Sequence, residues 1–251
     1  MALSFFADKR EPMIEIEQLK FRYPRSDFQL QIENLKVEPS QKVAVVGPSG
    51  SGKTTLLNLI AGIVTPDAGT IRVADQIIAG PGGSLGDAQR RDFRAAEIGM
   101  VFQRFELIDY LNVLDNVMLP FAINQSLGQP NTRPAAVEQA RQLIGEVGLA
   151  SKLRRRPNQL SQGEQQRVAI CRALVTDPQL ILADEPTGNL DPKNKQVILD
   201  LLFQESLERN QTLIVVTHDR GILDGFDRVV DFEQFYIDAG DGLDDDVEVA
   251  R

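Results

Sequence analysis

The feature that most constrains this chain is a short glycine-rich segment that follows an apolar run. Residues 47–54 read Gly-Pro-Ser-Gly-Ser-Gly-Lys-Thr and match the pattern G-x-x-x-x-G-K-[ST] at each fixed position. The preceding residues 42–46 form a nearly continuous apolar run, which is typical of a buried parallel strand, and apolar residues recur at helical spacing from 56 to 61. A strand, a glycine loop and a helix in this order present backbone N–H groups to an anion. The segment therefore predicts a phosphate-binding loop in an α/β fold.

The residue types within this loop predict a nucleotide together with a metal ion. Lys53 is expected to reach the β- and γ-phosphates, and the Thr54 hydroxyl is expected to ligate Mg²⁺. The predicted nucleotide-binding residues of this segment are Gly47, Pro48, Ser49, Gly50, Ser51, Gly52, Lys53, Thr54 and Thr55.

A second apolar run, at residues 180–183, ends in two carboxylates, Asp184 and Glu185. An acidic side chain at the end of a strand beside a phosphate-binding loop is expected to hold Mg²⁺, usually through water, and we assign that role to Asp184. Glu185 is placed to orient or activate an attacking water molecule. Guanine-binding proteins commonly carry Asn-Lys-x-Asp, whereas residues 194–197 read Asn-Lys-Gln-Val. The sequence therefore does not support specificity for GTP.

The order of elements along the chain predicts a parallel sheet that carries an inserted helical part. Alternating apolar residues predict strands over 13–23 and 28–37, antiparallel to each other, and a short strand pair over 70–78. Parallel strands are expected at 180–184 and 212–217. Helices are predicted over 112–124, 134–148, 161–175 and 193–208. Strand–helix–strand alternation at both ends, with helices between, indicates this architecture.

The segment Leu160-Ser161-Gln162-Gly163-Glu164-Gln165-Gln166-Arg167 lies between the two nucleotide motifs. With those motifs in this order, the chain resembles the ATP-binding subunit of an ABC transporter over about residues 13 to 230. Gln103 is similar to the Q-loop glutamine near the metal, Asp191 to the D-loop aspartate and His218 to the H-loop switch. Tyr23 lies where the family stacks an aromatic ring on adenine. The resemblance implies an ATPase that uses ATP and Mg²⁺, with Lys53, Gln103, Glu185 and His218 in its catalytic machinery.

The resemblance also implies a fold and a division of the chain. The expected fold class is an α/β P-loop NTPase (RecA-like) with a parallel core sheet, an N-terminal antiparallel β subdomain and an inserted α-helical subdomain. We expect a single ABC ATPase domain over 1–251, in which about 1–103 and 176–237 form the core and β subdomains. About 104–175 form the helical subdomain with the signature motif, and 238–251 form an acidic tail. Residues 232–235, Phe-Glu-Gln-Phe, lack the family's glycine turn, which leaves the fold of 230–251 open.

Signature residues act across a dimer in this family. The resemblance implies that Ser161, Gln162, Gly163 and Glu164 face the γ-phosphate bound by a second copy, together with Asp191. A local interpretation is equally compatible: Ser161 caps its helix and Glu164 completes a capping box. The two interpretations do not exclude each other.

The partners implied are a second copy, in a homodimer formed on ATP binding, and a separate membrane-spanning permease subunit. No run of 18 apolar residues is present, so we expect a cytoplasmic protein, peripheral on the inner face of the cell membrane. Residues 183–191, Ala-Asp-Glu-Pro-Thr-Gly-Asn-Leu-Asp, are similar to the branch of lipoprotein-releasing, macrolide-exporting and cell-division ATPases (LolD, MacB, FtsE). An amino-acid importer ATPase is the main alternative within transport.

Composition excludes several other classes. Lys and Arg number 27 against 36 Asp and Glu, a net charge of -9, which argues against a nucleic-acid partner because phosphate neutralisation needs a basic surface. The same balance disfavours a soluble ABC ATPase that acts on DNA or ribosomes. Cys171 is the single cysteine, so an intrachain disulfide framework is impossible and a small buried hydrophobic role is expected. A regulatory module without catalysis is disfavoured because Lys53 and Glu185 are both present.

Overall fold

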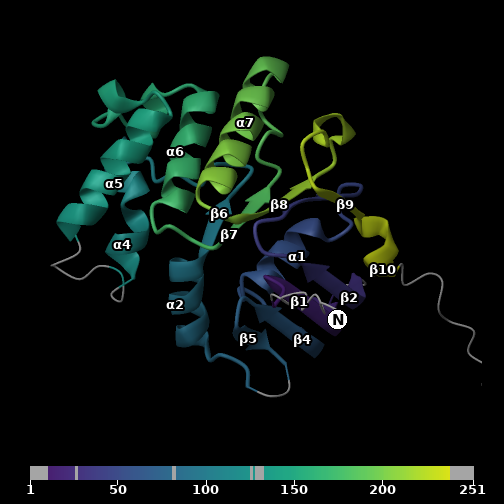
Figure 1. The fold of residues 1–251 in the computed structure, drawn as a ribbon. Helices are drawn as coiled ribbons and strands as arrows, with labels where there is room; N and C mark the ends of the chain where they lie inside the picture. Colours follow the sequence, from purple (N-terminus) through teal and green to yellow (C-terminus); the bar gives the residue numbers. More distant parts are fainter. Residues whose placement is uncertain (1–10, 26–27, 81–82, 125–126, 128–132, 238–251) are drawn as a thin grey trace, which may run out of the picture.

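The computed structural model describes residues 11–25, 28–80, 83–124, 127 and 133–237. Within this part, two five-stranded sheets are flanked by helices (Figure 1). The acidic tail predicted at 238–251 lies outside the described residues. No helix in the described ranges is long and apolar enough to cross a membrane.

The first sheet is parallel and supplies the strand ends on which the functional residues lie. Its order is β6-β7-β8-β3-β9, and each neighbouring pair is parallel. Except for the edge strand β9, which is mostly exposed, these strands are largely apolar because helices or the second sheet cover both faces. Their bounds are β3 Lys42–Val46, β6 Ile98–Val101, β7 Leu180–Asp184, β8 Thr212–Thr217 and β9 Arg228–Asp231.

The second sheet is antiparallel, with the order β10-β2-β1-β4-β5. Its long strands alternate buried and exposed residues, so one face packs into the core and the other faces solvent. β1 carries an irregularity near Gln18, whose φ of 50° shifts the register against β4. The bounds are β1 Ile14–Arg22, β2 Gln29–Val37, β4 Ala68–Val73, β5 Gln76–Ala79 and β10 Tyr236–Ile237.

The helices divide between the two faces of the parallel sheet. α1 shares one apolar cluster with the antiparallel sheet, and helices α5, α6 and α7 contribute to a second cluster on the opposite face. Figure 1 shows α4, α5 and α6 on one side of the parallel strands and the antiparallel strands on the other. The bounds are α1 Lys53–Ile60, α2 Asp87–Glu97, α3 Val113–Val117, α4 Leu119–Ile123, α5 Arg133–Glu146, α6 Gln162–Leu174 and α7 Pro192–Glu208.

Two local predictions differ from the structure. The single helix predicted over 112–124 is divided into α3 and α4 at Met118, and Pro120 follows in the first turn of α4. Proline has no N–H to donate to a carbonyl four residues earlier, so the first helix is not continued. α2 was not predicted, because none of its residues is buried and its sequence therefore carries no apolar stripe.

The C-terminal segment without the glycine turn forms a 3-10 helix, Phe232–Phe235, followed by β10. β10 pairs with β2 through Tyr236 opposite Leu30 and Ile237 opposite Gln29. Phe232 is fully buried, and its side chain lies behind Gly47 and Gly52 of the phosphate-binding loop. The end of the described chain thus supports the loop from behind.

Candidate functional site

The phosphate-binding loop connects β3 to α1, as predicted. Gly50 and Gly52 have φ values of 84° and 102°, a left-handed conformation that side chains with a Cβ seldom adopt. At Gly52 a Cβ would also lie 2.4 Å from Cζ of Phe28. Glycine at this position therefore allows both the turn and the approach of an aromatic ring.

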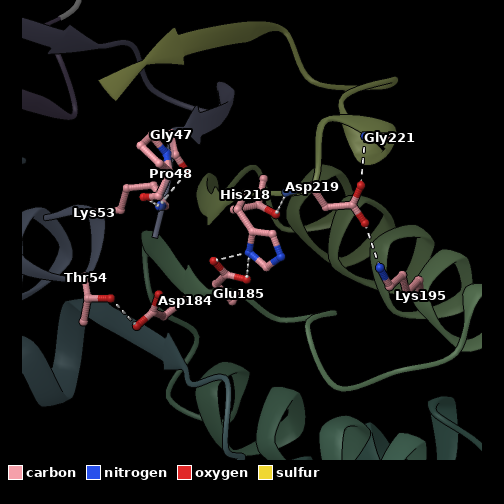
Figure 2. Close-up of polar contacts among 11 residues, drawn as sticks. Gly47, Pro48, Lys53, Thr54, Asp184, Glu185, Lys195, His218, Asp219 and Gly221 are labelled. Carbon is pink, nitrogen blue, oxygen red and sulfur yellow. Dashed lines mark hydrogen bonds and ion pairs between the residues drawn. The ribbon is translucent and has the colours of Figure 1, made fainter. Parts of the chain in front are cut away.

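Lys53 is buried at the start of α1 and points back into the loop. Its Nζ donates to the carbonyl oxygens of Gly47 and Pro48, at 2.8 and 2.7 Å (Figure 2). Burial lowers the pKa of Lys53, and the negative charges of Glu185 and Asp184 oppose that shift. The ammonium group thus lies inside the loop, where an anionic ligand would satisfy it better than two neutral carbonyls do.

Asp184 ends β7 and contacts the other polar residue of the loop. Thr54 Oγ1 donates to Asp184 Oδ2 at 2.9 Å (Figure 2). Burial raises the pKa of Asp184, the nearby Glu185 raises it further, and the bond from Thr54 lowers it. A hydroxyl and a carboxylate oxygen at this distance form a hard donor set that fits Mg²⁺. In the described part of the chain no cluster of three metal-ligating side chains occurs, so phosphate and water oxygens would complete the coordination.

Glu185 and His218 are brought together by the pairing of β7 with β8. His218 Nδ1 lies 2.7 Å from Oε1 and 2.6 Å from Oε2 of Glu185 (Figure 2). Glu185 has a left-handed φ of 46°, and its N–H donates to the carbonyl of Val216 in β8 at 3.0 Å. Such strain in a non-glycine residue is retained where the surrounding structure fixes it, often at functional sites. The carboxylate is thus held in one orientation.

Gln103 follows β6 and lies beside the segment after Glu185. Asn189 Nδ2 donates to the backbone carbonyl of Gln103 at 2.9 Å. A Cβ on Gly188 would lie 3.2 Å from Nε2 of Gln103 and 3.4 Å from Oε2 of Glu185. The Gln103 amide and the Glu185 carboxylate therefore approach each other around Gly188.

One cleft of about 390 Å³ is lined by Lys53, Thr54, Gln103, Asp184 and Glu185, whereas His218 does not line it. Tyr23 lines it, with its hydroxyl 3.4 Å from Thr55 Oγ1 and its ring packed edge-on against Phe21 at 4.7 Å. Phe28 also lines the cleft, with its ring centroid 5.9 Å from that of Tyr23. The lining residues are Tyr23, Phe28, Ser49, Gly50, Gly52, Lys53, Thr54, Thr55, Gln103, Asp184 and Glu185.

The predicted signature residues 161–164 are not among the residues that line this cleft. Ser161 caps α6 by accepting from the Glu164 N–H at 3.3 Å, and Glu164 Oε2 accepts from the Ser161 N–H at 2.9 Å. Lys152 contacts Glu164 and is the main cause of its lowered pKa. The capping box is therefore present in the structure, and Ser161 and Gln162 remain exposed.

Asp191 is likewise exposed, at the N-cap of α7. Its Oδ1 accepts from the N–H groups of Lys193 and Asn194, each at 3.1 Å. The residues predicted to act across a dimer are thus held in fixed positions by their own helices, outside the cleft of their own subunit.

A buried arginine, Arg172, contacts the segment after Gln103 and was not predicted from the sequence. Arg172 of α6 donates through Nη2 to the carbonyl of Phe105 at 2.6 Å and through Nη1 to that of Glu106. Phe105 and Glu106 have left-handed φ values of 61° and 48°. The segment after Gln103 is therefore fixed to the helix that begins at the signature. Only an arginine within an otherwise apolar helix face could have indicated this contact from the sequence.

Asp184→Asn is expected to raise the unfolding temperature of the nucleotide-free protein while lowering magnesium-dependent nucleotide hydrolysis by about a hundredfold. Because burial raises the pKa of Asp184 above its unfolded value, the charged carboxylate destabilises the fold at pH values above that raised pKa. Thermal unfolding at neutral and at acidic pH measures this. The difference between the variant and the natural chain should shrink as the pH falls and Asp184 is protonated. A variant that is less stable at neutral pH would contradict the expectation.

Comparison with known proteins gives a consistent result. The family described as ABC transporter matches residues 30–188, more than half of the chain. The lipoprotein-releasing system ATP-binding protein LolD of Chromohalobacter salexigens is 42% identical over 227 residues, 89% of this chain and 92% of that protein. The macrolide export ATP-binding/permease protein MacB of Rhodopirellula baltica is 43% identical over 221 residues, 87% of this chain but 31% of that protein.

Solved structures show the same likeness. The dimeric, post-hydrolysis ATP-binding cassette MJ0796 bound to ADP and Pi has 32% identity and a TM-score of 0.71, and the match covers 86% of this chain and 93% of that one. CbiO1 of Clostridium perfringens, part of the transporter complex cbiONQ, has 27% identity and a TM-score of 0.72, with 85% and 81% covered.

Proposed function

The chain belongs to the ABC transporter family, as an ATP-hydrolysing subunit that powers a membrane transporter, and on that premise we propose how its residues divide the work. The α/β P-loop fold class predicted from the sequence is confirmed by the cassette structures. The cofactor prediction, ATP with Mg²⁺, is confirmed for the family. The roles of individual residues and the boundaries of the subdomains at about 103 and 175 stay proposals.

Lys53, with the backbone N–H groups of the loop and of the first turn of α1, binds the β- and γ-phosphates. Thr54 and Asp184 would hold Mg²⁺, whose charge would stabilise the negative phosphate oxygens. Tyr23 stacks on the adenine at the far end of the same cleft. The contacts of Lys53 with Gly47 and Pro48, and of Thr54 with Asp184, support these roles, because each side chain is already aimed at the place of its ligand.

The observation that carries the catalytic proposal is the contact of Glu185 with His218 beside this loop. Glu185 accepts a proton from the water that attacks the γ-phosphorus, while the bond from that phosphorus to the bridging oxygen of ADP breaks. His218 orients the carboxylate, and Gln103, which lies beside Gly188, would contact the transferred group and the bound metal. The products are ADP and phosphate.

Two copies of the chain bind ATP between them. Ser161, Gly163 and Asp191 lie outside their own cleft, and the relatives of known structure include dimeric cassettes. Ser161 and Gln162 at the N-terminus of α6 are exposed, and the N–H groups of this helix end are available to the γ-phosphate held by the other copy. A γ-phosphate that contacts both copies joins them, and its hydrolysis releases them.

A separate membrane subunit docks in a cleft of about 650 Å³ between α2 and α4. Ile123 in this cleft is 74% exposed, an unusual position for a large apolar side chain. Arg172 and Glu106 also line the cleft, so a segment bound there contacts the residues that follow Gln103. Occupancy of the nucleotide site is thereby linked to the docked partner.

The LolD and MacB relatives support a branch that uses ATP for export, lipoprotein release or mechanical work in the periplasm. This chain would then lie on the cytoplasmic, inner face of the cell membrane. No feature of the sequence or the structure favours an amino-acid importer or a soluble ATPase acting on DNA or ribosomes.

The test uses a membrane permease that co-purifies with this chain in detergent. We expect the complex to hydrolyse Mg-ATP faster than the isolated chain. Ile123→Glu should weaken that association by at least about tenfold, because a charge enters an apolar contact, and should leave the basal rate unchanged. Ile63→Glu, at an exposed position outside the cleft, is the matched control. Full stimulation of the Ile123→Glu variant would contradict docking at this cleft.

A further inference from the structure

An ion pair joins two segments that border the catalytic pair. Lys195 Nζ lies 2.7 Å from Asp219 Oδ2, and both side chains are 30% exposed (Figure 2). Asp219 directly follows His218, and Lys195 lies in the first turn of α7. The pair therefore connects the segment of the histidine with the start of a different element.

Asp219 is fixed by more than the lysine. Its Oδ1 accepts from the Gly221 N–H at 2.9 Å, and its own N–H donates to Thr217 Oγ1 at 3.0 Å. The bond from Lys195 is the main cause of the lowered pKa of Asp219. With both carboxylate oxygens and the backbone bound, a displacement of Asp219 displaces the backbone of His218 as well.

Lys195 is fixed on the other side. Its N–H donates to the carbonyl of Asp191 at 2.9 Å in the first turn of α7, which Asp191 caps. The first turn has no acidic residue, and a cation at the positive end of a helix is electrostatically unfavourable. The Asp191 carboxylate at the N-cap bonds to Lys193 and Asn194, and Lys195 pairs instead with Asp219.

We propose that Lys195 is a positioning residue which, through Asp219, holds His218 against Glu185 and ties the histidine to the helix turn that carries Asp191. This inference rests on the proposed roles of His218, Glu185 and Asp191. Its consequence is that contact of a second copy with Asp191 is transmitted to the catalytic carboxylate within one subunit, through three contacts and the peptide bond between His218 and Asp219. The pair is not required for ATP binding, because neither residue lines the nucleotide cleft.

The test compares steady-state ATP hydrolysis by Lys195→Met, Asp219→Asn, the double variant and Lys195→Arg. Each neutral variant should lower kcat by about tenfold, with KM for ATP changed less than twofold, because a misplaced histidine affects the chemical step. The double variant should lose no more than either single variant, since both remove the same contact. Lys195→Arg should recover most of kcat. Lys193→Met removes a lysine from the same turn, and Arg220→Met removes a cation beside Asp219 that pairs with Asp231, so both serve as controls.

A kcat for Lys195→Met equal to that of Lys193→Met would overturn the inference. An effect of Lys195→Met on KM in place of kcat would also overturn it. So would a loss of activity that matches a fall in the thermal unfolding midpoint of the variant. Glu185→Gln, measured in parallel, separates the two levels of the proposal. If Glu185→Gln is inactive and Lys195→Met is fully active, only the positioning role is wrong. If Glu185→Gln hydrolyses ATP at the natural rate, the catalytic assignment is wrong and the positioning role is lost with it.

Discussion

Glu185→Gln is expected to lower kcat for ATP hydrolysis by about a thousandfold or more while ATP still binds. The amide keeps the size of the carboxylate and its place against His218, but it cannot accept the proton of the attacking water. Because the γ-phosphate then persists, the variant should form a dimer when ATP is added. An assay of phosphate release measures the loss of ATP hydrolysis. Size-exclusion chromatography with light scattering measures the formation of the dimer.

The matched control for this variant is Glu208→Gln at the exposed C-terminal end of α7, which should hydrolyse ATP normally. A dimer that appears with ATP only in Glu185→Gln would support both the shared γ-phosphate and the role of Glu185. An ATP-bound monomer would show that association requires the membrane partner. The proposal that the isolated subunit dimerises would then have to be withdrawn. Hydrolysis at the natural rate would contradict the role of Glu185.

Lys53→Met should weaken ATP binding by about a hundredfold, since charge-assisted bonds to two phosphates contribute about 3 kcal/mol. Lys53 as a residue is only 6% exposed, so in the Lys53→Met variant water cannot easily take the place of its ammonium group. Isothermal titration calorimetry with ATP, in the presence of Mg²⁺, measures the dissociation constant. AMP should bind both proteins equally weakly, because it lacks the phosphates that Lys53 contacts.

Lys20→Met is the control for this second variant, because Lys20 is exposed on β1 and does not line the nucleotide cleft. Its dissociation constant for ATP should match that of the natural chain. A Lys53→Met variant that binds ATP within twofold of the natural chain would show that the lysine does not contact the phosphates, and the proposed role of the loop would need revision.

Much of the fold was predictable because its signals are local. The apolar run before Gly47 and the glycines after it required a strand, a turn and a helix within 20 residues. The run before Asp184 predicted a second parallel strand by the same reasoning. The predicted strands over 13–23 and 28–37 correspond to β1 and β2, whose alternation of apolar residues reflects one buried face.

The predictions were wrong or incomplete where the determining contacts join residues far apart in the sequence, or where no apolar pattern exists. α2 carries no buried residue, and the division between α3 and α4 depends on Pro120. The glycine-free segment 232–235 left the C-terminal fold open, and its 3-10 helix owes its position to burial of Phe232 behind the loop. The contacts of Arg172 and Lys195 join residues separated by 66 and 24 positions, which no local pattern reports.

By itself the sequence determined which residues the site needs, because phosphate binding, metal binding and proton transfer each require particular side chains at particular spacings. Lys53, Thr54, Asp184 and Glu185 were predicted in this way, whereas His218 was predicted from the resemblance to the family. Only the tertiary structure decided how they are held: pairing of β7 with β8 places Glu185 against His218, and Asp219 and Lys195 fix that histidine to α7. It also placed the signature residues outside their own cleft. Chemistry of single side chains is local, whereas their distances depend on strand order and packing, which involve the whole chain.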